Sequence, residues 1–416
     1  MLHGAGGGGE PAFTFAATPV TRVEARGPGA WEVIRRTIDG SMRRAADARV
    51  PEDAMPDGRG HVVVLGYDLF RSLEPTAVAP RGARDDRGWP DALLLRCEGG
   101  LLAHGEAIVL RGDPRAVPDL ALRSAGPLPR PTLGPIQPDR PAEAYRETVA
   151  EVVERIHAGE CFQANLAQRF GVRFRGSVRS LAAAAFEIAR PRHGALVECA
   201  PGRAVVSMSP ELFLRTTPGP DGLVVATRPI KGTRPADAPS QELLESEKDT
   251  AELAMIVDLM RNDLGRVCRI GSIRVTDGRR IESHPTVHHG VAEIRGVLRP
   301  EASMTDLLAA TFPPGSVTGA PKVQAMRTID ELEPVRRGPY CGAIGWIGDD
   351  GRMTLNVAIR TITCAGVPLG AADELDGRLD YHAGCGIVAE SDPEAERLES
   401  LDKTEVLRRT IERLMR

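Results

Sequence analysis

From residue 142 onward, groups of strand-like stretches are separated by a few long helices, and this pattern constrains the fold more than any other feature. Apolar runs and alternation predict strands at 161–174, 195–200, 203–215, 222–230, 340–348, 353–363 and 378–388. Helical periodicity predicts helices at 142–157, 240–264, 303–311, 320–333 and 393–415. Because strands and helices do not strictly alternate, the pattern predicts an α+β fold of stacked antiparallel β-sheets flanked by helices.

A proline-rich segment divides the chain into two parts of different character. Residues 113–141 contain eight prolines and few periodic apolar positions, which is typical of a linker or a surface crossing. The division predicts an N-terminal subdomain over 1–140, with a flexible glycine-rich start, and a strongly patterned domain over 141–416. Within the first part, only the apolar runs 61–67 and 92–96 indicate buried strands.

Composition argues against several classes of protein. Lys and Arg total 53 against 57 acidic residues, for a net charge of −4, and no basic cluster favours a nucleic-acid partner. No apolar run approaches the roughly 20 residues that cross a bilayer, and the first residues lack a signal sequence. Seven scattered cysteines without a Cys-x-x-Cys pair are typical of a reducing compartment. We therefore expect a cytoplasmic protein with neither a membrane nor a nucleic-acid partner.

Two acidic doublets lie on predicted helices. Asp249 and Glu252 are three residues apart on one helix, and Glu396 and Glu399 are three apart on the last helix. At that spacing, both carboxylates of a doublet project from nearly the same helix face. If the two helices are neighbours, four hard oxygen ligands would suit Mg²⁺. An ordinary solvated helix face explains such doublets more often, so the pattern alone leaves both interpretations open.

A glycine-rich loop at 312–322 leads into a predicted helix. Thr318 is expected to cap this helix, and the free N–H groups of its first turn favour a small carboxylate or phosphate. An ordinary loop-to-helix turn is an equally good explanation.

Two basic residues occupy unusual settings. Lys231 follows the apolar stretch 223–227, where partial burial would lower its pKa and make its amine a nucleophile or base. Arg360 lies within the strand-like run 355–363, and a buried arginine needs an anionic partner such as a substrate carboxylate or a structural acid. Near the end of the chain, Gly384 and Gly386 would let a ligand approach the backbone closely. Each signal is weak by itself, because most lysines are plain surface charges.

Read in order, these segments resemble the chorismate-utilising enzyme family over roughly residues 141–416. The matching segments are 158–165, 209–211, 229–235, 248–252, 256–263, 287–289, 315–322, 336–340, 359–361, 384–388 and 391–399. The resemblance implies a fold like that of anthranilate synthase component I. It also identifies 141–416 as the chorismate-binding catalytic domain.

The resemblance also implies roles for individual residues. Magnesium would be held chiefly by Glu252 and Glu399, assisted by Asp249 and Glu396. Glu211 would protonate the departing 4-hydroxyl of chorismate, Lys231 would be the nucleophile, and His289 would lie near the ring. The substrate would be bound by Gln163, Gly232, Thr233, Thr318, Gly319, Ala320, Lys322, Tyr340, Arg360, Gly384, Cys385, Gly386 and Lys403.

Two positions are similar to one branch of the family. Gln163 stands where the branches that add water have a lysine, and Lys231 stands where anthranilate synthases have an alanine. The Pro-Ile-Lys-Gly-Thr form resembles aminodeoxychorismate synthase component I, which implies 4-amino-4-deoxychorismate as the product, for para-aminobenzoate and folate synthesis. The ammonia would come from a separate glutamine amidotransferase (glutaminase) subunit. Two alternatives stay open: anthranilate synthase component I, and a non-catalytic paralogue that binds chorismate or a partner.

Several residues depart from the family pattern beside the matching motifs. Ala236 and Asp237 follow the lysine motif in place of Arg-Gly, and Gly290 and Ala292 alter the segment after His289. These departures affect loop flexibility and the contacts around the site, whereas the implied metal ligands are unchanged.

Overall fold

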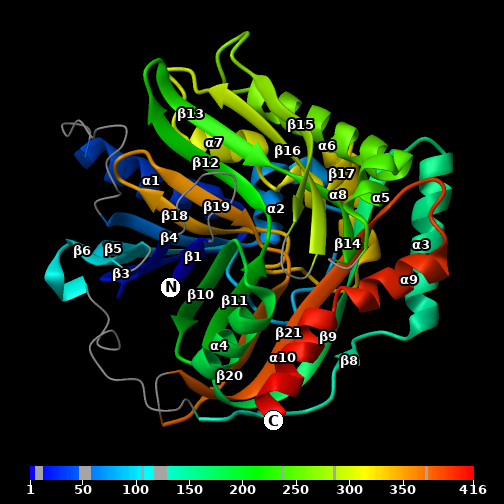
Figure 1. Ribbon diagram of the computed structural model, residues 1–416, viewed down its shortest axis with the longest axis horizontal. Coiled ribbons are helices and arrows are strands. Elements are labelled where there is room, and N and C mark those ends of the chain that lie inside the picture. The colour runs from blue at the N-terminus through cyan, green and yellow to red at the C-terminus, as the bar shows by residue number, and fades with distance from the viewer. Residues whose placement is uncertain are drawn as a thin grey trace.

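Antiparallel strands form two sheets, and helices pack around them (Figure 1). The computed structural model describes residues 1–4, 13–45, 58–104, 107–116, 129–235, 238–283, 287–370 and 373–416. The first sheet contains β1 (Leu2–Gly4), β2 (Phe13–Ala16), β6 (Ala107–Gly112), β7 (Thr132–Leu133), β8 (Gln137–Pro138), β9 (Gln163–Ser177), β10 (His193–Ala200), β11 (Arg203–Ser209), β17 (Gly319–Ala320), β20 (Thr361–Pro368) and β21 (Glu374–Ile387). This architecture confirms the predicted α+β class.

The second sheet lies against the first and shares one strand with it. It contains β3 (Thr21–Ala25), β4 (Arg59–Leu65), β12 (Leu212–Gly219), β13 (Gly222–Arg228), β14 (Ile230–Pro235), β15 (Arg274–Ser283), β16 (Val287–Val297), β18 (Ala343–Gly348) and β19 (Met353–Val357). The long strand β5 (Ala92–His104) pairs with β3 and β4 at its start and with β2 and β6 at its end. It therefore runs from one sheet into the other.

The helices cover the outer faces and edges of the sheets (Figure 1). They are α1 (Ala30–Ala45), α2 (Phe70–Leu73), α3 (Ala142–His157), α4 (Val178–Ala189), α5 (Ser240–Glu245), α6 (Glu247–Gly265), α7 (Met304–Thr311), α8 (Lys322–Leu332), α9 (Pro393–Asp402) and α10 (Glu405–Met415). Helix α6 packs against β16 and α7, α9 packs against α3 and β21, and α10 packs against α4. The two acidic doublets thus lie on helices that border different parts of the sheets.

The predicted boundary near residue 140 does not separate two hydrophobic cores. Strand β4, from the N-terminal third, pairs along its whole length with β18. Ile34 and Val63 belong to the same buried apolar cluster as Leu166, Ile256 and Leu355. The N-terminal segment therefore completes the second sheet, and residues 117–128 of the proline-rich stretch lie outside the described residues. The glycine-rich part of the predicted flexible start, residues 5–12, lies outside the described residues.

Two predicted helices are each broken in the structure. The helix predicted at 240–264 is divided into α5 and α6 at Ser246, whose hydroxyl accepts a hydrogen bond from the Asp249 backbone N–H at 3.2 Å. The helix predicted at 393–415 is divided into α9 and α10 at Lys403 and Thr404. Both breaks place a turn beside a predicted metal-binding doublet, which a simple helical periodicity does not reveal.

The strand predicted at 353–363 is also interrupted. Strands β19 and β20 are separated by residues 358–360, and Arg360 has a φ of +49°. Arg360 therefore lies in a bend between two strands of different sheets, where a left-handed conformation is uncommon for a non-glycine residue.

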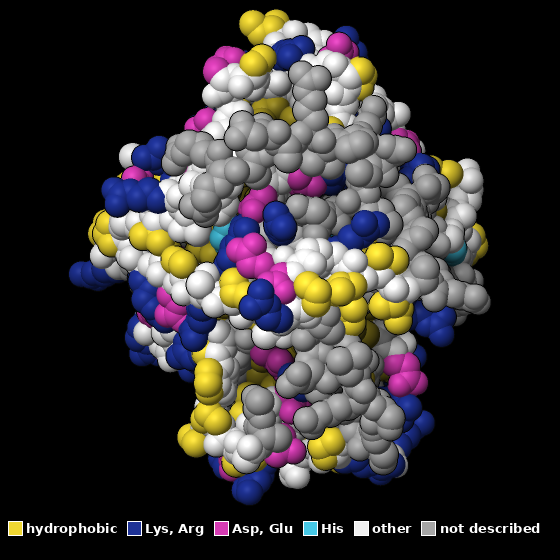
Figure 2. All heavy atoms as spheres, turned by 90° about the vertical axis from the view of Figure 1, so that its left-hand side faces the viewer, with side chains coloured by type: hydrophobic (Ala, Val, Ile, Leu, Met, Phe, Trp, Pro, Cys, Tyr) yellow, Lys and Arg dark blue, Asp and Glu magenta, His cyan; other side chains and the backbone are white. Residues whose placement is uncertain are grey.

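The described surface carries mixed charge, and no helix among the described residues is long and apolar enough to span a membrane. Figure 2 shows Lys and Arg side chains interspersed with Asp and Glu on one face of the molecule. Many of these charges are paired across short distances, as in the pair between Arg179 and Glu198 at 2.7 Å.

Asp330 on α8 ties the N-terminal third to the rest of the fold. Its side chain is only 2% exposed, it pairs with Arg71, and it accepts hydrogen bonds from the backbone N–H groups of Ala79 at 3.0 Å and Ala83 at 3.1 Å. This one carboxylate therefore satisfies three donors from a segment more than 240 residues away in sequence.

We predict that Asp330→Ala lowers the free energy of unfolding by about 3 kcal/mol, because it leaves buried donors and the Arg71 charge without a partner. Urea unfolding followed by circular dichroism measures the change. Asp258→Ala is the matched control, since that carboxylate is 80% exposed and its ion-pair partner is Arg261 on its own helix. Equal stability of the two variants would contradict the anchoring role of Asp330.

Candidate functional site

The pairing of β9 with β21 brings Gln163 and Gly386 to the same face of the first sheet. In this register Gly386 is opposite Asn165 and Gly384 is opposite Ala167, so odd residues of β9 and even residues of β21 project to one side. A Cβ atom on Gly386 would overlap Gln163 Nε2 and would lie 3.3 Å from Lys231 Nζ. The structure therefore brings Gln163, Lys231 and Gly386 together, as the sequence predicts.

Lys231 enters this region from β14, in the other sheet. Its ammonium lies 3.6 Å from Glu252 Oε2 of α6, and the two side chains are 13% and 17% exposed. The next residue, Gly232, has a φ of +79°, and a Cβ there would lie 2.9 Å from Asp249 Cγ. A side chain at position 232 would thus be strained and would strike the first turn of α6. The glycine lets β14 run close enough to α6 for the ion pair to form.

Glu211 follows β11 and is buried, with 3% of its surface exposed. No described residue donates a hydrogen bond to its Oε1 atom. Burial raises the pKa of Glu211 to about 7, although the nearby Ser316 hydroxyl and Lys231 ammonium act in the opposite direction. A carboxyl group with this pKa is partly protonated near neutral pH, so it can donate a proton to a leaving group.

His289 and Thr233 are opposite each other where β14 pairs with β16. His289 Nδ1 and Thr233 Oγ1 are 2.9 Å apart, and the histidine is 2% exposed. The hydrogen bond fixes the orientation of the imidazole ring beside the strand that carries Lys231.

The second acidic doublet lies on α9, beside Cys385 of β21. Ligand atoms of Cys385, Glu396 and Glu399 all lie within 4.8 Å of one another. Burial raises the pKa of the Cys385 thiol, so the sulfur keeps its proton and donates to the Glu396 carbonyl at 3.5 Å. Lys403 pairs with Glu399 at 2.8 Å and donates to the Gly384 carbonyl at 2.8 Å. The two carboxylates are hard oxygen donors of the kind that Mg²⁺ prefers.

The carboxylates of the first doublet, Asp249 and Glu252, contact cationic side chains of β14. Asp249 accepts from Arg234 Nη2 at 2.9 Å, and Glu252 pairs with Lys231. Among the described residues, no group of metal-binding side chains includes Asp249 or Glu252. The structure thus brings Glu396 and Glu399 together, whereas the other two carboxylates are held by cationic side chains.

Tyr340 stacks on a neighbouring ring, whereas Arg360 is without a charged partner among the described residues. The Tyr340 ring stacks on His382, with centroids 5.1 Å apart and an interplanar angle of 13°. Burial lowers the pKa of Arg360, and no hydrogen bond or ion pair links its guanidinium to the residues that the structure describes. A partly buried arginine without a protein anion is available for an anionic ligand.

The glycine-rich loop is built differently from the prediction. Helix α8 begins after Pro321, so the prediction that Thr318 caps it is wrong; the Thr318 hydroxyl donates instead to the Gly315 carbonyl at 3.1 Å. Gly319 and Ala320 form β17 against the start of β9. Lys322 Nζ binds Asp263 and the carbonyls of Thr311 and Pro313, at 2.5, 2.9 and 3.0 Å. These contacts fix the loop beside Gln163.

Sequence reasoning missed three polar side chains of this region. Asn165 Nδ2, Ser316 Oγ and His382 Nε2 are buried without a hydrogen-bond partner among the described residues. Asn165 follows Gln163 at the strand period of two, and His382 precedes Gly384 at the same period. Strand periodicity applied to the motifs would have identified both.

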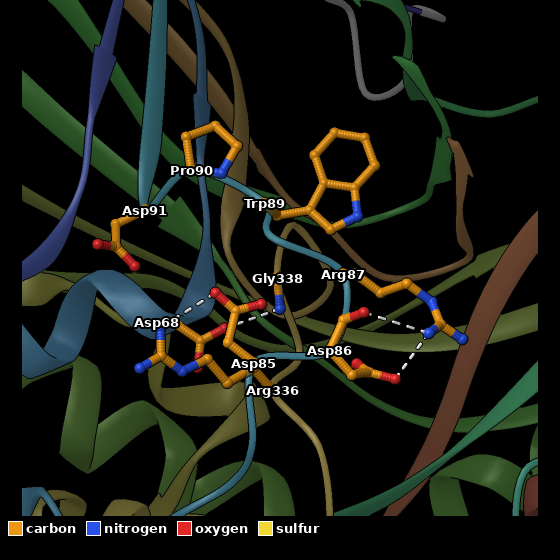
Figure 3. Close-up of a pocket in the computed structure, with 9 residues that line it drawn as sticks. All are labelled: Asp68, Asp85, Asp86, Arg87, Trp89, Pro90, Asp91, Arg336 and Gly338. Atoms are coloured by element: carbon orange, nitrogen blue, oxygen red, sulfur yellow. Dashed lines mark hydrogen bonds and ion pairs between the residues drawn. The ribbon is translucent and has the colours of Figure 1, made fainter. Parts of the chain in front are cut away.

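A separate cleft lies between the N-terminal third and residues 336–338 (Figure 3). It is lined by Asp68, Asp85, Asp86, Arg87, Trp89, Pro90, Asp91, Arg336 and Gly338. Its charged groups mostly pair with one another or with the backbone, as where Asp68 accepts from the Gly338 N–H at 2.8 Å. None of the predicted site residues lines it.

We predict a pH-dependent stability difference between the wild type and Glu211→Gln. Below pH 4.5, the ordinary pKa of a glutamate, the carboxyl is neutral in both the folded and unfolded states. As the pH rises towards the raised folded pKa of about 7, only the unfolded state ionises freely, so the wild type loses roughly 3 kcal/mol of stability. The glutamine variant does not ionise and keeps that stability.

Urea unfolding of both proteins, from about pH 5 to about pH 8, measures the difference. The stability of Glu211→Gln relative to the wild type should increase with pH. A difference that stays constant with pH would show that the Glu211 pKa is not raised.

Comparison with known proteins finds relatives that match most of the chain. The sequence profile of chorismate binding enzymes matches residues 7–409. Anthranilate synthase component 1 1 of Haloarcula marismortui is 36% identical over 95% of this chain and 83% of its own length. Aminodeoxychorismate synthase component 1 of Escherichia coli is 36% identical over 92% of this chain and 82% of its own length.

A solved structure has the same fold. Anthranilate synthase component I from Streptococcus pneumoniae superposes with a TM-score of 0.79 at 26% identity, covering 97% of this chain and 93% of that one. The matches extend from the N-terminal third to α10 and include every segment that carries a predicted site residue. The chain therefore belongs to the family of chorismate binding enzymes.

Proposed function

We propose that this protein is component I of aminodeoxychorismate synthase, which converts chorismate and ammonia to 4-amino-4-deoxychorismate. The observation that carries the proposal is the position of Lys231. Its primary amine lies beside Gly386 and Gln163 and close enough to the Glu211 carboxyl to affect its pKa. An amine so placed supplies a nucleophile that an alanine at the same position would lack.

In the proposed reaction, the Lys231 ammonium first loses a proton to water, and the resulting amine attacks C2 of the chorismate ring. The ring double bonds shift and the C4–O bond breaks, and Glu211 donates its proton so that the 4-hydroxyl leaves as water. Ammonia then attacks C4, the double bonds shift back, and the lysine amine departs from C2. The enolpyruvyl group is retained throughout. The raised pKa of Glu211 supports its role, because a carboxyl with an ordinary pKa would be almost fully ionised at neutral pH.

The two carboxylates of chorismate need separate partners. We assign the enolpyruvyl side to Arg360 and Tyr340, because the Arg360 guanidinium is without an anion among the described residues and Tyr340 is a buried aromatic donor. We place the ring beside the bare backbone of Gly384 and Gly386, where a Cβ would collide with neighbouring strand or side-chain atoms.

We further propose that Mg²⁺ is held by Glu396, Glu399 and Glu252, with Asp249 assisting. The carboxylate oxygens of the first two residues lie within 4.8 Å of each other, which fits one shared cation. When bound, the cation would neutralise and orient the ring carboxylate. The ion pair between Glu252 and Lys231 occupies that carboxylate in the protein alone.

The ammonia would come from a separate glutamine amidotransferase subunit. All seven cysteines of the chain are buried, so none is presented as a nucleophile for glutamine hydrolysis. The designation "component 1" of the curated relatives also supports a partner of this kind.

Anthranilate synthase component I is the second candidate, since a relative with that name matches at the same identity. The two reactions differ in one product: anthranilate formation releases pyruvate, whereas amination at C4 does not. A coupled pyruvate assay therefore distinguishes them.

We predict that the wild type, with Mg²⁺ and excess ammonium, consumes chorismate without releasing an equal amount of pyruvate.

Lys231→Ala should lower kcat by about 100-fold or more, as expected for the loss of a catalytic group. Lys231→Arg is the matched control, because a guanidinium keeps the charge facing Glu252 and is too basic to act as a nucleophile.

Both variants should lose activity and remain folded. Full activity of Lys231→Arg would contradict the covalent role of the lysine. Stoichiometric pyruvate release by the wild type would assign the protein to the anthranilate synthases.

A further inference from the structure

His382 lies in the middle of β21, on the face that carries Gly384 and Gly386. Residues of a strand alternate between its two faces, so positions 382, 384 and 386 project to the same side. The pairing of β9 with β21 is unbroken here, which fixes the position of His382 opposite Arg169. His382 is thus the nearest side chain on that face before the bare glycine backbone begins.

The His382 ring packs flat against Tyr340. Their ring centroids are 5.1 Å apart with an interplanar angle of 13°, and the two residues are 7% and 4% exposed. The Tyr340 ring has a second neighbour in the Arg337 guanidinium, 5.8 Å from its centroid. Arg337 is itself held by Glu333 and by the Val317 carbonyl. Tyr340 is therefore bordered by one charged and one aromatic side chain.

The imidazole of His382 is uncharged and lacks a full set of partners. Its Nε2 atom is buried without a hydrogen bond to any described residue. Burial lowers its pKa to about 3, reinforced by nearby Arg169 and Arg337 and opposed by Asp380 and Asp86. A buried polar atom without a partner is destabilising, so an aliphatic side chain would pack here at lower cost. What a leucine would not supply is a flat ring against Tyr340.

We propose that His382 is a positioning residue of the chorismate site, which holds the Tyr340 ring in its binding orientation by stacking against it. The inference rests on the proposed contact between Tyr340 and the enolpyruvyl side of chorismate. Stacking restricts rotation of the phenol, so the bound orientation exists before the substrate arrives. The contribution should appear in substrate binding more than in the chemical step.

Substitutions that separate the ring from its nitrogens test the proposal. His382→Leu removes the ring and keeps an apolar side chain, His382→Gln removes the ring and keeps polarity, and His382→Phe keeps the ring and removes both nitrogens. The ringless variants should raise KM for chorismate about threefold to tenfold with little change in kcat. His382→Phe should retain KM within about twofold and unfold no earlier than the wild type, because it removes an unpaired nitrogen.

A double variant tests whether the effect passes through Tyr340. If it does, His382→Leu combined with Tyr340→Leu should raise KM no more than Tyr340→Leu alone, because the stack is already lost. His193→Leu, on β10 where no predicted site residue lies, is the control for a merely structural histidine. It should leave KM unchanged, whatever its effect on the unfolding midpoint.

Wild-type KM for both ringless variants would overturn the inference, and so would a His382→Phe variant as impaired as His382→Leu. The glutamine variant supplies the ringless comparison if the leucine variant does not fold. Calorimetric titration of chorismate into each protein tests the role of His382 separately from the proposed function. Equal affinities across the variants and the wild type would refute only the role of His382. Chorismate consumption with pyruvate release would refute only the amination.

Discussion

The pairing of β9 with β21 is the interaction on which the rest of the site depends. The ladder runs without a break from Ser177 opposite Glu374 to Ala164 opposite Ile387. One end of β9 also pairs with β17, which anchors the glycine-rich loop, and one face of β21 supports α9 with its two glutamates. A one-residue slip in register would turn every side chain on these strands to the opposite face. The register therefore determines which groups face the substrate.

The charged side chains around this ladder are either paired or unpaired, and this difference bears on what the candidate site can bind. Lys231 and Glu252 are paired across the junction of β14 and α6, so each offsets the cost of burying the other. Arg360 has no ion-pair partner among the described residues, and burial lowers its pKa. Burial raises the pKa of Glu211 to about 7, although Lys231 and Ser316 partly oppose this change. A cation without a protein anion and an acid that can be neutral suit an anionic substrate that must lose a hydroxyl group.

The fold class could be predicted because it depends on local patterns, whereas the site residues were proposed from ordered motifs. Alternation and helical periodicity located the strands and most helices, and motif order located Lys231, Glu211 and Gly386. The breaks at Ser246 and Lys403 were not predicted, because a helix interrupted by a turn keeps nearly the same apolar period. The division of the acidic doublets was also missed, since it depends on cations from β14 that approach α6 only in the folded chain. His382 lies outside the matching motifs, and its stacking against Tyr340 is seen only in the folded structure.

In the reaction that we propose, nitrogen enters the ring at C4 while the enolpyruvyl group stays in place. The most direct measurement is NMR spectroscopy of the product formed from chorismate and ¹⁵N-labelled ammonium with Mg²⁺. We predict ¹⁵N coupled to C4 of a non-aromatic ring that still carries the enolpyruvyl ether. An aromatic product with ¹⁵N on C2, adjacent to the ring carbon that bears the carboxylate, together with free pyruvate, would contradict amination at C4.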